Sequence, residues 1–114
     1  MDVKRNIETL RALIGHEVGE SDWFAIEQSD VDQHAATTGD TEWFHTDRNR
    51  AVASPFGDTI VQGFLLLSQL TRMADSISLP IENAEYLLNY GFDRVRIVQP
   101  VAVDNPPPDQ GSRQ

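Results

Sequence analysis

An aspartate and a histidine five positions apart are the two side chains best placed to do chemistry together. Asp40 follows Gly39 directly, and His45 closes the same short segment. A carboxylate and an imidazole about one water molecule apart can hold that water between them and exchange its protons. The competing interpretation is structural: Asp40 caps a turn, and His45 is a surface histidine or a core histidine with satisfied hydrogen bonds.

Other kinds of chemistry find less support in the residue types. The chain has no cysteine, which excludes disulfides, thiolate nucleophiles and metal centres bound by thiolates. His16 and His34 lack partners at metal-ligand spacing, so we predict no metal site. No serine lies in a nucleophile elbow, and no glycine-rich loop is present to hold a phosphate. Acid–base chemistry without a resident cofactor remains.

The size and charge of the chain narrow the possible partners. Its 114 residues, 39% hydrophobic and 24% charged, predict one soluble domain. A net charge of −9 argues against nucleic acid and would repel an anionic substrate unless local basic residues offset it. No apolar run approaches the ~18 residues of a membrane span, and the N-terminus has no signal-peptide core. We therefore expect a cytoplasmic protein with no membrane partner.

Two helices are expected to flank the segment that carries the pair. Ser29 is a good N-cap, and the helix that it starts should run to about Thr37 and stop at Gly39. Asp47–Ala53 is a candidate for a further short helix. Rigid elements on both sides would then position Asp40 and the histidine that follows it.

A long apolar helix is the strongest structural signal. Between Gly63 and Ser76 the apolar residues occupy nearly every face of the expected helix, so it must be buried on nearly all sides. In so short a chain, a sheet curled around that helix is the economical cover. β-Structure is predicted at Ser21–Glu27, Glu85–Tyr90 and Asp93–Val103, an amphipathic helix over Val3–Ile14 up to Gly15, and a disordered proline-rich tail over 104–114.

Three ordered blocks of the sequence resemble one family. The first resembles the hydratase-2 motif of MaoC-like dehydratases, in which Gly-Asp precedes a histidine five positions after the aspartate; it reads Thr38-Gly39-Asp40-Thr41-Glu42-Trp43-Phe44-His45. The family's link into its central helix is similar to Pro55–Phe64, and its next strand is similar to Asn89-Tyr90-Gly91 with Val95-Arg96. The resemblance implies an α+β hot-dog fold over 1–103, in which a curved antiparallel sheet wraps a long central helix, commonly as a homodimer.

The chain departs from the family pattern in two places. The common motif has Asn-Pro where this chain has Glu42-Trp43, and a subgroup of single-domain MaoC-like hydratases is similar in tolerating Gln-Trp there. Family members also continue past the position of Val103 with several more strands, whereas this chain has its proline-rich tail. On this comparison the chain looks truncated, and we expect the sheet to be incomplete at its C-terminal end.

The resemblance implies an (R)-specific enoyl-CoA hydratase, which adds water reversibly to trans-2-enoyl-CoA. Coenzyme A is part of that substrate, and no separate cofactor is implied. Asp40 and His45 would hold the water, and the Gly63 N–H would stabilise the thioester oxygen. The assignment of acid and base to the pair stays open. Candidates for contact with the substrate are Phe56, Ile60, Val61, Gln62 and Tyr90, although plain core packing explains such residues about as well.

Other functions remain open at this point. A non-catalytic hot-dog module that only pairs with a partner, or an inactive truncated chain, would fit the missing strands. A thioesterase of the same fold would keep the helix but needs a different placement of its carboxylate, so the spacing of Asp40 and His45 favours the hydratase. Arg94 and Arg96 are interpreted as a solvated strand face, with contacts to coenzyme A phosphates as the alternative.

Overall fold

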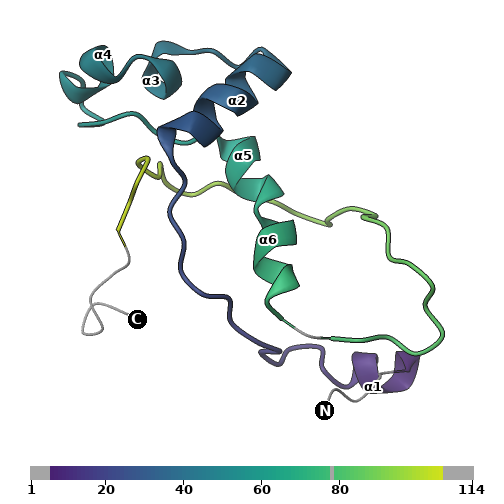
Figure 1. The fold of residues 1–114 in the computed structure, drawn as a ribbon. Coiled ribbons are helices and arrows are strands. Elements are labelled where there is room, and N and C mark those ends of the chain that lie inside the picture. The colour runs from purple at the N-terminus through teal and green to yellow at the C-terminus, as the bar shows by residue number, and fades with distance from the viewer. Residues whose placement is uncertain (1–5, 78, 107–114) are drawn as a thin grey trace. The chain divides into compact units, whose positions relative to one another are not determined.

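The computed structural model describes residues 6–77 and 79–106. The chain divides into two compact units: one combines Met1–Asp22 with Leu70–Arg96, and the other combines Trp23–Gln69 with Ile97–Gln114 (Figure 1). None of the helices in the described ranges is long and apolar enough to cross a membrane. The start of the predicted N-terminal helix and most of the predicted tail, from residue 107 onward, lie outside the described residues.

In the first unit, the N-terminal residues form a short, well-capped helix, α1 (Ile7–Arg11). The Asn6 side chain accepts a hydrogen bond from the Thr9 N–H, and the Thr9 hydroxyl oxygen accepts one from the Asn6 N–H, both at 2.9 Å. The helix ends at Arg11 with Ala12 as its C-cap residue, so it is shorter than the predicted helix to Ile14, and Gly15 lies beyond its end with a φ of +83°. α6 (Leu70–Asp75) belongs to the same unit.

The second unit contains the remaining helices that are described: α2 (Gln28–Thr38), α3 (Trp43–Thr46), α4 (Arg48–Val52) and α5 (Gly63–Ser68). α2 begins earlier than predicted, because the Glu27 N–H donates to Asp30 Oδ2 at 2.9 Å and makes Glu27, not Ser29, the N-cap residue. Its predicted end is confirmed, since Gly39 has a φ of +79°. The short helix predicted within Asp47–Ala53 is confirmed as α4.

The prediction of one continuous helix over Gly63–Ser76 is wrong. α5 ends at Ser68, whose hydroxyl donates to the Leu65 carbonyl at 2.6 Å. The Gln69 N–H bonds only three residues back, to the Leu66 carbonyl, at 3.1 Å. Both bonds tighten the last turn and satisfy carbonyls that a longer helix would use. The prediction of burial on all sides is also wrong, because Phe64 in the first turn is 76% exposed.

The core of the second unit is small and joins residues distant in sequence. Its buried apolar side chains are Ile26, Val31, Val61, Leu65 and Val103, with Phe24, Leu66 and Val101 packed against them. Asp104, which we predicted to start a disordered tail, is instead held at this core, since its N–H donates to the Ile26 carbonyl at 2.8 Å. The ordered part therefore extends at least to that residue.

Strand pairing in residues 6–77 and 79–106 is sparse: residues 59–61 run antiparallel to 101–103, and Ile81 is a further isolated bridge position. The bridge joins Ile60 to Ala102, the Val61 N–H donates to the Val101 carbonyl at 2.8 Å, and the Val103 N–H donates to the Thr59 carbonyl at 3.1 Å. The strands predicted at Ser21–Glu27, Glu85–Tyr90 and Asp93–Val103 are not formed as named strands. An alternating pattern decides which face a strand would bury, but a ladder also needs a neighbouring chain segment to share its hydrogen bonds.

Candidate active site

The predicted pair comes together at the end of α2. Gly39 turns the chain out of the helix, Asp40 follows it, and α3 brings His45 back, so that His45 Nε2 and Asp40 Oδ2 lie 3.8 Å apart. This distance is longer than a direct hydrogen bond, which spans roughly 2.7–3.2 Å. The His45 side chain is 8% exposed and that of Asp40 is 43% exposed. One member of the pair is therefore held in the fold while the other is open to water.

The ring of His45 is oriented by a backbone carbonyl. Its Nδ1 lies 2.7 Å from the Ile60 oxygen, and a carbonyl can only accept, so Nδ1 carries the hydrogen. In the neutral ring, Nε2 then has a free lone pair on the side of Asp40. The Phe44 ring packs against the imidazole at 4.5 Å between centroids. This geometry leaves Nε2 as the ring nitrogen that can accept a proton on the side of Asp40.

A cavity of about 310 Å³ lies beside His45, at the lower end of the range typical of small-molecule sites, and Asp40 is outside its lining. It is formed within the second unit, by the segments around α3 and α5 and by the returning chain at 97–100. Its lining residues are His45, Ile60, Val61, Gly63, Leu66, Ile97, Val98, Gln99 and Pro100. Imidazole and the start of α5 therefore share one cavity whose other walls are mainly apolar.

Gly63 allows close packing at the entrance of α5. A Cβ added there would lie 2.5 Å from Ile97 Cδ1, which is too close for any side chain without movement of the isoleucine. As the first residue of the helix, Gly63 has an N–H for which the helix itself offers no partner. The close packing of Ile97 thus requires a residue without a side chain at this position. The same residue has a backbone amide that is available as a hydrogen-bond donor.

Of the other residues predicted to contact substrate, two line the cavity and three do not. Ile60 and Val61 line the cavity, whereas Gln62 does not; its side chain is fully buried and donates through Nε2 to the Val31 carbonyl at 3.0 Å. Phe56 is 43% exposed and is also outside the cavity lining. Tyr90 is fully exposed and belongs to the other unit.

The lining residues at 97–100 and Leu66 were missed by sequence reasoning. Ile97 and Val98 have the alternation of a strand, which indicates a buried face but not which distant element it contacts. Arg94 and Arg96 are exposed, as expected for a solvated face. In the described part of the chain, no three side chains of the metal-ligating types gather into one group.

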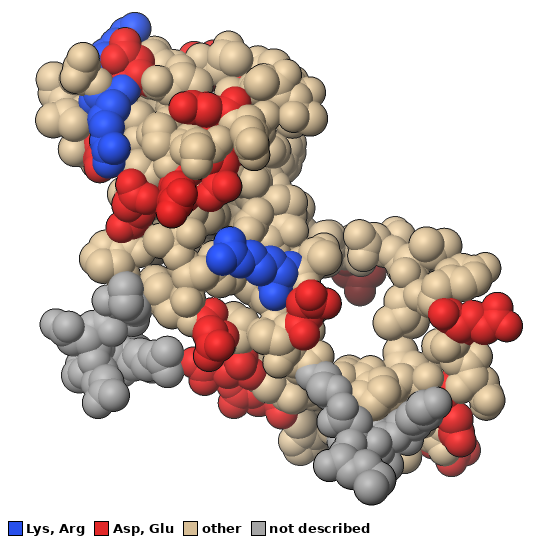
Figure 2. Space-filling view, viewed as in Figure 1, with Lys and Arg blue, Asp and Glu red and all other residues tan. Residues whose placement is uncertain are grey.

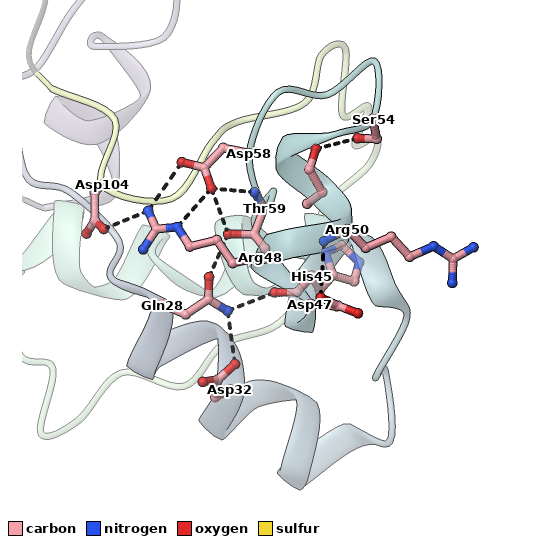
Figure 3. Close-up of polar contacts among 11 residues, drawn as sticks. Gln28, Asp32, His45, Asp47, Arg48, Arg50, Ser54, Asp58, Thr59 and Asp104 are labelled. Atoms are coloured by element: carbon pink, nitrogen blue, oxygen red, sulfur yellow. Dashed lines mark hydrogen bonds and ion pairs between the residues drawn. The ribbon is translucent and has the colours of Figure 1, made fainter.

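An ion pair holds the segment that leads to Ile60. The Arg48 guanidinium donates to both carboxylate oxygens of Asp58, at 3.1 and 3.2 Å, and lies 3.7 Å from Asp104 (Figure 3). The hydrogen bond from Arg48 and then that from the Thr59 N–H lower the pKa of Asp58, and the same pair raises the pKa of Arg48. Acidic side chains outnumber basic ones by 18 to 9, and they also predominate on the face shown in Figure 2. The Arg48 guanidinium therefore offsets the repulsion between carboxylates at this place.

The lowered pKa of Asp58 predicts an acid-dependent contribution to stability. Its carboxylate stabilises the fold fully above the ordinary pKa of 3.8, and this contribution is lost as the pH falls through the lower pKa of the folded state. Asp58→Asn should therefore slightly reduce the free energy of unfolding at pH 7 and converge with the parent in strong acid. Urea unfolding across this pH range measures the difference, with exposed Asp22→Asn as the control. A difference that grows on acidification would contradict the assignment.

The sequence and the structure both match known proteins. A model of the family described as MaoC like domain matches residues 9–106. Over 98 residues the chain is 40% identical to 3-hydroxyacyl-thioester dehydratase Z of Mycobacterium tuberculosis, covering 86% of this chain and 64% of that protein. Over 97 residues it is 40% identical to nodulation protein N of Rhizobium meliloti, covering 84% of this chain and 60% of that protein. The chain therefore spans less than two thirds of the length of these relatives.

A solved structure supports the same relationship at the level of the fold. The X-ray structure of monoamine oxidase regulatory protein from Archaeoglobus fulgius is similar with a TM-score of 0.61 and 26% sequence identity. The similarity covers 90% of this chain and 67% of that chain. The backbone fold of this chain is thus similar to that of another protein.

Proposed function

The chain belongs to the MaoC-like domain family, and we propose on that basis that it is a hydro-lyase. It would add water reversibly to a trans-2-enoyl thioester, with coenzyme A as the carrier, and form the (R)-3-hydroxyacyl thioester. The observation that carries this proposal is that His45 lines the cavity while its Nε2 lies 3.8 Å from Asp40 Oδ2. The name of the relative 3-hydroxyacyl-thioester dehydratase Z supports a thioester substrate.

The geometry suggests how the pair would act on water. A water molecule about 2.8 Å from both Nε2 and Oδ2 would bridge their gap with two hydrogen bonds. Nε2 takes one proton of this water, while Asp40 accepts a hydrogen bond from the other hydrogen and aims the oxygen at C3. As the C3–O bond forms, the electrons of the C2–C3 double bond move to C2 and are shared with the thioester oxygen. The proton on Nε2 then returns to C2.

The remaining lining residues fit the two ends of such a substrate. The Gly63 N–H would donate to the thioester oxygen, where negative charge grows during the reaction. The apolar side chains of Ile60, Val61 and Leu66 would pack against the acyl chain. The water molecule would thus bind at the polar end of the cavity, and the acyl chain would contact the apolar walls.

A direct assay separates the candidate activities. Purified chain is incubated with crotonyl-CoA, and loss of the enoyl thioester, free thiol and 3-hydroxybutyryl-CoA are all measured. Conversion to the (R)-3-hydroxy product supports the hydratase, whereas release of free coenzyme A without hydration would support a thioesterase. Absence of both reactions in folded protein would overturn the proposed activity and favour the non-catalytic pairing module.

We also propose the hot-dog fold and homodimer that the family resemblance implies. Large apolar side chains remain exposed along the predicted strand region, and a monomer rarely leaves such a run uncovered. The most exposed are Tyr86, Leu87, Leu88 and Tyr90, each above 70%. A second chain could cover them and supply strand neighbours.

The proposed dimer predicts a measurable mass and a sensitive residue. Sedimentation velocity over a dilution series should give twice the chain mass, and Leu88→Glu should shift the population toward monomer because it places a charge in the apolar contact. Exposed Gln33→Glu on α2 serves as the matched charge control. A parent chain that remains monomeric and sharply folded at every concentration would contradict the dimer.

A further inference from the structure

A side-chain amide outside the cavity joins the elements that carry the proposed catalytic pair. Gln28, the first residue of α2, donates through Nε2 to the His45 carbonyl at 2.8 Å and to Asp32 Oδ1 at 2.9 Å. Its Oε1 accepts from the Thr59 hydroxyl at 2.6 Å (Figure 3). The carbonyl and the carboxylate can only accept, so the orientation of the amide is defined by its partners.

These bonds close a ring around His45. The backbone oxygen of His45 is held by Gln28, Gln28 is held by Thr59, and the next residue, Ile60, holds the His45 ring through its carbonyl at 2.7 Å. The Ile60 N–H also donates to the Phe44 carbonyl at 2.9 Å, which fixes the same two segments to each other. The main chain and the ring of one histidine are thus tied to a single polar circuit.

The circuit is well placed to keep its geometry. Thr59 is fully buried and His45 is 6% exposed, so water cannot easily replace a lost partner. The backbone of Thr59 is held on both sides, since its N–H donates to Asp58 Oδ1 at 2.7 Å and its carbonyl accepts from Val103. Because Thr59 is fixed, a rotation of the Gln28 amide would change the position of His45 and not that of Thr59.

We infer that Gln28 and Thr59 are positioning residues that keep His45 in its Nδ1–H form, with Nε2 directed at the water site. The inference rests on the proposed function where activity is the readout, but the state of the imidazole can be measured without any substrate. Without the Thr59 hydroxyl, the amide oxygen loses the side-chain donor that the structure gives it, and the amide can turn. The His45 carbonyl and ring are then free to shift relative to Asp40.

The test compares Thr59→Val and Gln28→Met with two matched controls. Thr59→Ser keeps the hydroxyl, and Gln33→Met makes the same change at an exposed position of α2 that is outside the circuit. Nitrogen chemical shifts of the His45 ring should show one tautomer in the parent and both controls, and a mixture in the two test variants. Unchanged ring signals in Thr59→Val and Gln28→Met would overturn the inference.

The second measurement is steady-state kinetics, with kcat expressed per mole of folded protein. Thr59→Val and Gln28→Met should each lower kcat by roughly 10- to 100-fold with a smaller change in KM, because the proton-transfer geometry is lost more than binding. The double variant should fall little further, since both changes open one circuit, and Thr59→Ser should recover most of kcat. A parent without hydratase turnover would refute the proposed function, while the ring signals would still decide the positioning role. If Thr59→Val does not fold, Gln28→Met carries both measurements.

Discussion

Replacing Asp40 with asparagine or His45 with glutamine should lower kcat for the hydration of crotonyl-CoA by about 100- to 10,000-fold. Each change keeps the approximate size of the side chain but removes the group that holds or takes a proton from water. The KM should change less, because the apolar cavity walls do not depend on either side chain. The measurement is steady-state hydration at equal concentrations of folded protein.

The controls for this experiment remove the same functional groups elsewhere. His16→Gln and Asp22→Asn alter exposed residues outside the cavity and should retain the parental kcat. Thermal melts verify that all four variants remain folded. Near-parental kcat in either Asp40→Asn or His45→Gln would show that water is activated by another group.

The second large effect is expected when the Gly63 N–H is removed. Proline at the first position of a helix keeps the helical φ, and its ring replaces a hydrogen that the helix does not use. Gln62, with ψ at 137°, already has the extended conformation required before proline. A Cβ at position 63 would meet Ile97 Cδ1, so the experiment uses Ile97→Val, which lacks that atom. Gly63→Pro in this background should lower kcat by about 100- to 1,000-fold, the usual effect of losing one oxyanion donor.

The matched control is Gly63→Ala in the same Ile97→Val background. It adds the same Cβ but keeps the N–H, whereas proline replaces that hydrogen with its ring Cδ. The comparison of kcat between the alanine and proline variants therefore separates the effect of the added Cβ from the effect of replacing the N–H. Equal kcat values in the two variants would contradict a role for this amide in stabilising the thioester oxygen.

The sequence by itself determined the local arrangement of the candidate pair. Gly39 ends α2 because glycine readily adopts the left-handed conformation, and Asp40 must then follow the helix end directly. The five-residue separation from His45 is short enough for one turn of α3 to bring the side chains near each other. The motif resemblance also led to the correct family, because its residues and spacing are read along the chain and need no long-range contact.

Local pattern was less reliable where an element depends on its neighbours. The apolar run after Gly63 has the composition of one helix, yet the hydroxyl of Ser68 competes for a carbonyl and α5 ends there. The alternating residues of 85–103 have strand periodicity, yet of these residues only 101–103 take part in strand pairing. Periodicity records which face is apolar, whereas pairing requires hydrogen bonds from another segment.

Only the tertiary structure decided how His45 is held and what surrounds it. Its ring bonds to Ile60, its carbonyl to Gln28, and the cavity wall comes from the chain at 97–100. The bond to Ile60 joins residues 15 positions apart, and the bond to Gln28 joins residues 17 positions apart. Such distant residues meet only when the whole unit packs and closes the chain between them. Gln62 illustrates the difference. It is adjacent to Gly63 in sequence, but its side chain is buried in the core and bonds to the Val31 carbonyl. Burial and the available carbonyl decide this direction, and proximity in sequence does not.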